Sequence, residues 1–275
     1  MNLPSGVEVV AVRTPTLPPA THTNTWIVGE GTFTVFDPAS PYEDEQRRLA
    51  THVQRRIDRG ERFERIALTH HHQDHVSGAI ALRDAFFPRV PIAAHPITAA
   101  RVAPHIHVDE PWHHQETKLC GGLSVTAHFT PGHAPGHLVF QEARSKAVIA
   151  GDMVAGIGTI LIDPLDGDLG EYLASLEAMR KLAASMLLPA HGPSLTQPDA
   201  ILSFYIAHRH QRTEQIRQAL DQLGTATPLA LVPLVYADLP AEAHKVGAIQ
   251  ITAHLLWMQR HGLADLHAGS WQLSR

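Results

Sequence analysis

The amino-acid sequence predicts an α+β protein of two parts. In the first part, short apolar segments with strand-type composition alternate with longer segments of helical spacing. The composition changes near residue 198, and the segments after it are mainly helical. We therefore expect one domain at residues 1–198 and a second, smaller domain at residues 199–275.

The first domain is predicted to contain many short strands and a few helices. Strand patterns lie at residues 7–13, 25–28, 32–36, 66–69, 91–94, 123–129, 138–141, 147–150 and 186–188. Helical spacing occurs at 41–59, 76–87 and 168–184. Between residues 94 and 123 the chain is polar, and we expect a surface loop that exposes His105, His107, His113 and His114.

The second domain shows the element order of a winged helix. Helical patterns at 199–223, 229–236 and 241–259 precede two extended segments, 263–267 and 270–273, which meet at Ala268-Gly269. From residue 199 onward the chain carries as many basic as acidic residues. Arg209, Arg212 and Arg217 fall on the first helix and could contact phosphates, but a solvated face is the better prediction, and we expect no binding of duplex DNA.

The composition excludes several classes of protein. A hydrophobic fraction of 44% is typical of a globular chain. The formal net charge of −5 gives no overall electrostatic attraction to nucleic acid. Cys120 is the single cysteine, so an intrachain disulfide and a thiolate-rich metal site are excluded. No apolar run reaches about 18 residues and no leader pattern opens the chain, so we expect a cytoplasmic protein without a membrane span.

The pattern His70-x-His72-x-Asp74-His75 directly follows the strand at 66–69. Alternate side chains of an extended loop face the same side, whereas neighbouring ones diverge, which suits two adjacent ions better than one. About 0.006 matches to this pattern are expected by chance in a chain with 21 histidines. The sequence therefore predicts a metal site here.

Three further ligand-type residues also follow short apolar strands. His133 lies in Thr-Pro-Gly-His, Asp152 in Gly-Asp and His191 in Pro-Ala-His-Gly. Each signal is weak alone, but strand ends are where sheets of this kind place functional groups. Together with the first motif they offer five histidines and two carboxylates, enough for two zinc-type ions.

These motifs resemble, in their order, those of the metallo-β-lactamase-fold hydrolases. The resemblance implies an αββα sandwich with one or two metal ions at one edge. It implies that one ion is held by His70, His72 and His133 and the other by Asp74, His75 and His191, with Asp152 bridging them. Antibiotic-degrading members generally lack a carboxylate at the position of Asp152, so we expect this chain not to be a true β-lactamase.

A closer resemblance links the chain to the lactamase-β-like group, which has a C-terminal winged-helix-type domain and an endoribonuclease member. It rests on four segments: residues 156–159 (GIGT), 172–176 (YLASL), 189–193 (PAHGP) and 207–209 (AHR). The resemblance implies phosphodiester hydrolysis of single-stranded RNA by a metal-bridging hydroxide, with Asp74 and Asp152 as catalytic ligands.

Two other functions stay open at the level of the sequence. Near-neutral charge and the lack of an aromatic and basic stripe favour a small ester, thioester or lactone, as in glyoxalase II. A ligand-sensing winged-helix DNA-binding protein is the non-enzymatic alternative, and the low basic content argues against it. Zinc is the expected metal, and iron or manganese fits the same ligands. The sequence makes no prediction of the oligomeric state.

Four more residues are candidates for supporting roles. Asp37, after the strand at 32–36, resembles a position that orients a metal ligand, although a turn role is equally compatible with the pattern. His137 is expected beside the ligands. Thr159 and Tyr172 are candidates for substrate contact, and a core position is the better prediction for Tyr172.

Overall fold

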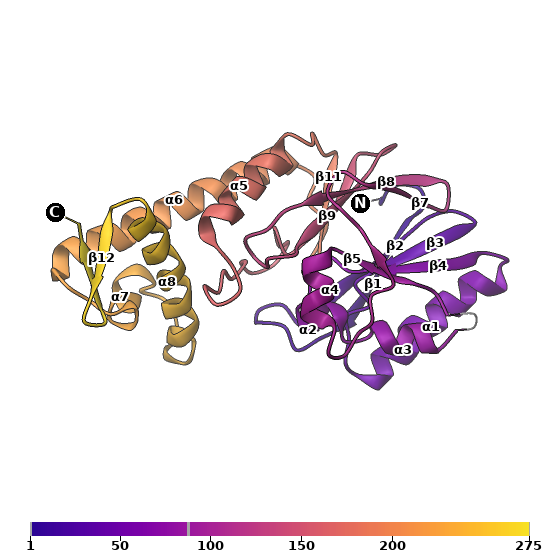
Figure 1. The fold of residues 1–275 in the computed structure, drawn as a ribbon, viewed down its shortest axis with the longest axis horizontal. Helices are drawn as coiled ribbons and strands as arrows, with labels where there is room; N and C mark the ends of the chain where they lie inside the picture. Colours follow the sequence, from indigo (N-terminus) through magenta and orange to yellow (C-terminus); the bar gives the residue numbers. More distant parts are fainter. Residues whose placement is uncertain (1, 87–88, 275) are drawn as a thin grey trace.

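Two β-sheets packed face to face, with helices on their outer faces, form the larger part of the molecule (Figure 1). The computed structural model describes residues 2–86 and 89–274. Within these residues the first sheet has six strands in the order β1-β2-β3-β4-β5-β6, and the second has five in the order β11-β10-β9-β8-β7. This arrangement is the αββα sandwich predicted from the sequence.

The first sheet changes from antiparallel to parallel pairing at its third strand. Its strands are β1 (Val7–Arg13), β2 (His22–Val28), β3 (Thr32–Phe36), β4 (Arg62–Ala67), β5 (Ile92–Ala94) and β6 (Glu110–Pro111). The pairs β1-β2 and β2-β3 are antiparallel, and the pairs from β3 to β6 are parallel. Its outer face packs against α1 (Glu43–Asp58), α3 (Ala79–Asp84) and α4 (Pro96–Val102) through one apolar cluster.

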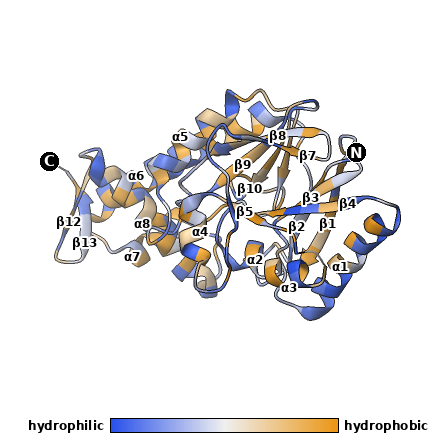
Figure 2. Ribbon diagram, turned by 45° about the vertical axis from the view of Figure 1, so that its right-hand side comes forward, coloured by the Kyte–Doolittle hydropathy of each residue, from blue (hydrophilic) through white to orange (hydrophobic). Residues whose placement is uncertain are grey.

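The second sheet closes the sandwich. It consists of β7 (Thr117–Cys120), β8 (Leu123–Phe129), β9 (Leu138–Glu142), β10 (Ala147–Gly151) and β11 (Met186–Pro189). Between the sheets, the ring of Phe140 lies 5.0 Å from that of Phe36 and 4.8 Å from that of Trp112. Figure 2 shows the hydrophobic colouring of the strands that face this core. Helix α5 (Leu169–Arg180) covers the outer face.

The long helix α6 (Pro198–Leu223) connects the sandwich to the C-terminal part (Figure 1). Its beginning contributes Leu202 and Tyr205 to the core around α5, whereas its end contributes Ile216 and Leu220 to a separate apolar core. That second core is built by α7 (Pro228–Val235), α8 (His244–Arg260), β12 (Ala264–His267) and β13 (Ser270–Leu273), with a 3₁₀ helix at Ala241–Ala243. Since α6 serves both cores, the boundary at residue 198 stays a prediction.

The helix predicted at 76–87 is divided into α2 (Gln73–Val76) and α3. Gly78 lies at the break, where its backbone N–H donates to the carbonyl of Pro38 at 2.8 Å. A β-carbon at this position would lie 2.5 Å from the same oxygen, so only glycine allows this approach. Phe87, the predicted end of the helix, lies outside the described residues.

Residues 95–122 hold more regular structure than the predicted loop. Pro96 opens α4, and the His95 ring accepts a hydrogen bond from the N–H of Ile97 as its N-cap. Strands β6 and β7 follow, both too short to show a clear alternation. The four loop histidines are exposed, as predicted.

None of the helices in the described ranges combines the length and the apolar character needed to cross a membrane.

Candidate metal centre

Four connections at one edge of the sandwich carry the predicted ligand residues. The loop after β4 and the short helix α2 supply His70, His72, Asp74 and His75, while His133, Asp152 and His191 follow β8, β10 and β11. Potential ligand atoms of all seven residues fall into overlapping groups whose members lie within 4.8 Å of one another. The tertiary structure thus brings together every residue of the predicted set.

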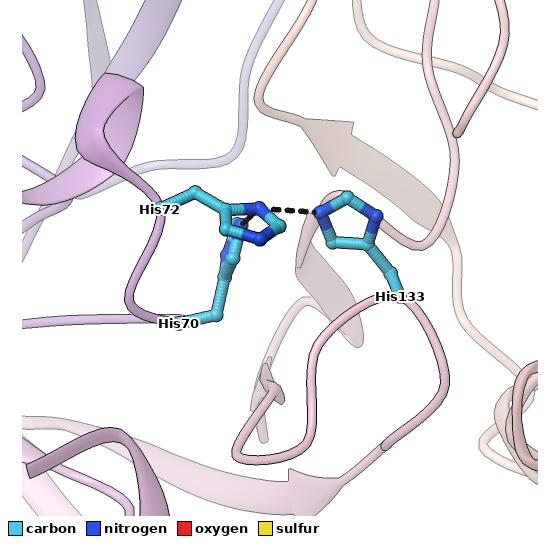
Figure 3. A group of neighbouring side chains, drawn as sticks. All are labelled: His70, His72 and His133. Carbon is cyan, nitrogen blue, oxygen red and sulfur yellow. Dashed lines mark hydrogen bonds between the residues drawn. The ribbon is translucent and has the colours of Figure 1, made fainter. Parts of the chain in front are cut away.

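Three imidazole nitrogens converge on one point between two of these loops (Figure 3). Nδ1 of His72 lies 3.0 Å from Nε2 of His70 and 2.9 Å from Nε2 of His133. His70 is fully buried and His133 nearly so. Three lone pairs directed at one point are the arrangement that an N-ligated divalent cation requires.

A second group lies beside the first and is linked to it by Asp152. Nε2 of His191 lies 3.6 Å from a carboxylate oxygen of Asp74, and His75 belongs to the same group. Asp152 Oδ1 lies 3.5 Å from Nε2 of His75 and 3.4 Å from Nε2 of His191, whereas Oδ2 lies 3.5 Å from Nε2 of His133. The two oxygens of one carboxylate therefore face the two groups.

The buried polar atoms of this cluster fit a divalent cation. Nε2 of His75 and Oδ1 of Asp152 are buried and have no hydrogen-bond partner. Unpaired buried polar atoms are costly, and a bound metal ion is one of the few partners that satisfies nitrogen and carboxylate oxygen together. The donor set, imidazoles with carboxylates, suits zinc and several neighbouring transition metals.

Each of the five histidines has a partner on the ring nitrogen that points away from the cluster. These contacts are His70 Nδ1 to Thr69 Oγ1 (2.9 Å), His72 Nε2 to Asp166 Oδ2 (2.9 Å), His75 Nδ1 to Asp37 Oδ2 (2.9 Å), His133 Nδ1 to the Leu161 carbonyl (2.9 Å) and His191 Nδ1 to the His22 carbonyl (3.0 Å). Such partners fix the tautomer and the orientation of a ligand ring. With a metal ion bound, the nitrogens that face the cluster would be the ones without a proton.

Asp37 takes the supporting role that its sequence position suggested. It is buried at a positive φ of 49° directly after β3. Its carboxylate accepts hydrogen bonds from the N–H and the hydroxyl of Thr69 in addition to its contact with His75. It thereby supports candidate ligands of both groups, because the Thr69 hydroxyl also contacts His70.

Asp166 was not found from the sequence. Its Oδ2 lies within 3.0 Å of Nε2 of both His71 and His72, and its Oδ1 lies 3.1 Å from the Arg101 guanidinium. Burial would raise the pKa of this carboxyl, but hydrogen bonds from His71 and His72 outweigh it and lower the pKa. No motif marks an aspartate 94 residues away from its partner, so the contact emerges only in the fold.

The charges of the cluster compensate one another. Burial opposes protonation of His75, but the carboxylates of Asp152 and Asp37 outweigh it and hold its pKa well above the ordinary value. Conversely, burial opposes ionisation of Asp152, but His75 and His191 keep its pKa well below the usual range. Burial lowers the pKa of His133 to about 4.

His137 holds the backbone of Asp152 in place. Its Nδ1 contacts the hydroxyl of Thr130 at 3.0 Å, and its Nε2 accepts a hydrogen bond from the N–H of Asp152 at 3.1 Å. Gly151 adopts a φ of +48° beside it, where a β-carbon would lie 2.5 Å from Nε2 of His137. The Gly-Asp pair is thus part of the site's construction.

A cavity of about 260 Å³ opens over the cluster. Its lining consists of residues of the loop at 15–20, residues between 155 and 163, and five residues of the cluster: His72, Asp74, His133, Asp152 and His191. Thr159 lines this cavity, as one candidate role required. Tyr172 does not; it is fully buried, and its hydroxyl donates to the Met153 carbonyl.

The three arginines of α6 differ in their exposure, and each has a partner within the protein. Arg209 is buried and donates to the carbonyl of Ile160, Arg212 donates to the carbonyl of Val235, and Arg217 pairs with Glu214 at 2.8 Å. The expectation of one solvated face therefore holds for the exposed Arg217. It is wrong for Arg209, which is buried, and holds only in part for Arg212, which is half-buried.

Two family models match the chain in the order of its two cores. The metallo-beta-lactamase superfamily matches residues 18–191, and the beta-lactamase associated winged helix domain matches residues 227–271. The chain belongs to the metallo-β-lactamase superfamily. It is therefore a hydrolase of that superfamily, with a winged-helix domain at its C-terminal end.

Curated relatives match over most of the chain. A lactamase-like protein of Penicillium aethiopicum is 31% identical over 71% of this chain and 62% of its own length. A beta-lactamase-like protein 2 homolog of Drosophila melanogaster is 29% identical over 72% of this chain and 68% of its own length. An atrochrysone carboxyl ACP thioesterase of Aspergillus fumigatus is 28% identical over 66% of this chain and 58% of its own length. The matched stretch thus spans about three fifths to two thirds of these relatives.

The complete fold, including the C-terminal domain, occurs in a solved structure. A beta-lactamase domain protein from Burkholderia ambifaria superposes with a TM-score of 0.85 at 18% identity, covering 100% of this chain and 93% of that one. The similarity extends through both cores, so the placement of the winged helix beside the sandwich is a property of the shared fold.

Proposed function

We propose that the protein is a metal-dependent hydrolase of thioester or ester bonds in small substrates with an apolar acyl group. The observation that carries the proposal is the chemical character of the cavity over the metal cluster. Apart from the cluster itself, its walls are mostly proline, alanine and aliphatic side chains. An apolar pocket with convergent polar groups at its base suits a small molecule.

Two divalent ions would be held by the residues that the resemblance implied. His70, His72 and His133 would hold one ion; Asp74, His75 and His191 would hold the other; and Asp152 would lie between them. When bound, such ions act as Lewis acids that activate water and polarise the scissile carbonyl at neutral pH. Zinc is the proposed metal.

The protein's own residues supply position and charge. Asp152 presents one oxygen to each group, and its ionised state is favoured by the neighbouring His75 and His191. Asp74 lines the cavity and is the proposed acceptor of the proton that the attacking water loses.

The cavity favours a neutral acyl substrate over RNA. Among the described residues, none that lines the cavity is lysine or arginine, and three aspartates do line it: Asp74, Asp152 and Asp163. Single-stranded nucleic acid is normally held by cations and by aromatic rings on which bases stack. Leu17 and Ile157 instead line the cavity with 52% and 43% of their surface exposed, so an acyl chain could pack against them. The thioesterase named among the relatives also supports an acyl substrate.

The deciding experiment offers the zinc-loaded protein both substrate classes. Acyl-thioesters of increasing chain length and an unstructured RNA are incubated with wild type, with Asp152→Ala and with Asp199→Ala, which removes an exposed carboxylate on α6. We expect thioester turnover by wild type and Asp199→Ala, and at least about a hundredfold loss in Asp152→Ala and after chelation. RNA cleavage without thioester turnover, sensitive to Asp152→Ala, would overturn the proposal in favour of the endoribonuclease prediction. Full activity without metal would exclude both.

A further inference from the structure

One wall of the cavity is a loop without regular secondary structure. Residues 155–163, called here the pocket wall, lie between β10 and α5, and seven of them line the cavity. A loop of this kind has no strand ladder or helix to satisfy its peptide groups, so side chains or water must do so. The position of the pocket wall therefore depends on what contacts its backbone.

Three buried side chains of α6 and α8 provide these contacts. The Tyr205 hydroxyl accepts a hydrogen bond from the N–H of Ala155 at 2.9 Å and donates to the Ala155 carbonyl at 3.1 Å. The side-chain oxygen of Gln250 accepts from the N–H of Ile162 at 3.1 Å. The Arg209 guanidinium donates to the carbonyl of Ile160. All three anchoring side chains are buried.

On its other side the pocket wall is connected to the metal cluster. The carbonyl of Leu161 contacts Nδ1 of His133 at 2.9 Å, and the N–H of Gly156 donates to the carbonyl of His191 at 2.7 Å. A β-carbon on Gly156 would lie 2.3 Å from the Pro193 carbonyl, so the two loops are in close backbone contact. The pocket wall thus lies between two predicted ligands and two helices.

We infer that α6 and the winged-helix domain set the width of the substrate cavity, with Tyr205, Arg209 and Gln250 as positioning residues for the pocket wall. The consequence for acyl substrates rests on the proposed function, whereas the anchoring itself does not. Gln250 is the informative residue, because it lies on α8, within the matched winged-helix region and 88 residues from its partner. Loss of its oxygen leaves the Ile162 N–H buried and unpaired.

The three arginines of α6 take part in contacts within the protein. Arg209 and Arg212 of α6 are bound to backbone carbonyls, and Arg217 is paired with Glu214. Apolar residues of α8 also join the core around α5, including Ala253 and the partly buried Trp257. A domain packed against the sandwich in this way can hold the loops of the sandwich in position.

The test measures the pocket wall first without any substrate. Amide hydrogen exchange is followed in wild type, Gln250→Leu, Gln250→Glu and Gln259→Leu, the last being the same change at an exposed position of α8. We expect exchange in residues 155–163 to rise about tenfold in Gln250→Leu, as for the loss of one buried hydrogen bond. Gln250→Glu, which keeps an acceptor oxygen, and Gln259→Leu should resemble wild type. Unchanged exchange in Gln250→Leu would overturn the inference.

Turnover then tests the effect on selectivity. On short-chain and long-chain acyl-thioesters, Gln250→Leu should change the ratio of the two KM values severalfold, with kcat and zinc content close to wild type. Equal effects on both substrates, or the same change in Gln259→Leu, would contradict the inference. If Gln250→Leu does not fold, Tyr205→Phe replaces it, with Tyr42→Phe as the exposed control. Absence of thioester turnover in wild type overturns the proposed function alone, because hydrogen exchange still decides the anchoring.

Discussion

Asp166 Oδ2 lies 2.9 Å from Nε2 of His72, while Nδ1 of the same ring faces His70 and His133. The carboxylate therefore selects the tautomer in which Nε2 carries the proton and Nδ1 is free for a metal. His72 is the ligand residue on which the geometry of the three-histidine group depends most, because its Nδ1 is within 3.0 Å of both other nitrogens.

Removal of this carboxylate should weaken one metal group selectively. We expect Asp166→Ala to lower zinc affinity at the three-histidine group about 10- to 100-fold, since His72 loses its orienting partner. Competition with a chromophoric chelator measures the affinity of each ion. Arg101→Met removes the cation beside Asp166 but leaves its contact with His72, and should have little effect. Two ions bound by Asp166→Ala with wild-type affinity would contradict the assignment.

The two groups should differ in the protons that zinc displaces. Carboxylates raise the pKa of His75 and His191 against the opposing effect of burial, whereas burial lowers the pKa of His70 and His133. The raised pKa of His75 favours its protonated form in the absence of metal, so zinc must compete with a proton for Nε2 of this ring. Because the raised pKa means that His75 and His191 hold a proton more strongly, protons compete better with zinc as the pH falls. The zinc affinity of the group of Asp74, His75 and His191 should therefore decrease more steeply from pH 8 to 6 than that of the three-histidine group.

Calorimetric zinc titrations in two buffers of different ionisation enthalpy count these protons. We expect about one to two protons released at the group of Asp74, His75 and His191, and fewer at the three-histidine group. Equal proton release for both ions would show that the charge balance around Asp152 is different from the one described.

Gly151→Ala should destabilise the protein more than an alanine at a comparable glycine elsewhere. Gly151 and Gly122 both have positive φ, but a β-carbon at 151 would collide with His137, whereas one at 122 meets nothing within 4 Å. We expect a loss of about 1 kcal/mol for Gly122→Ala and about 2 kcal/mol or more for Gly151→Ala, in the free energy of unfolding. Urea denaturation of the metal-free proteins measures both, and equal losses would exclude a role for the collision.

Asp37→Asn tests the carboxylate that supports both groups. The carboxylate of Asp37 contacts three donor groups: the N–H and the hydroxyl of Thr69 and Nδ1 of His75. An asparagine side chain has one acceptor oxygen instead of two, so it cannot serve all three. We expect a loss of about 2–3 kcal/mol in the free energy of unfolding, together with weaker zinc binding. Asp58→Asn changes an exposed aspartate on α1 and is the control. A variant at position 37 that is as stable as this control would count against the network.

Much of the fold followed from local patterns. Strands such as β1 and β3 have the predicted bounds, because each is a continuous β-type run between turn residues. The break at Gly78 was missed, since it arises from a contact with Pro38, forty residues earlier. Short elements such as α4 and β6 were missed because two to seven residues do not contain enough repeats to reveal a period.

The sequence by itself determined which residues bring metal-type chemistry to the site, because histidines and aspartates directly after apolar strands are a local pattern. Only the tertiary structure decided which atoms face one another: the two oxygens of Asp152 toward two groups, Asp166 beside His72, and Gln250 beneath the pocket wall. These contacts join residues 19 to 94 positions apart, and no local period records them. They exist because close packing of the two sheets and the C-terminal helices brings these polar groups together in the interior, where each needs a partner within reach.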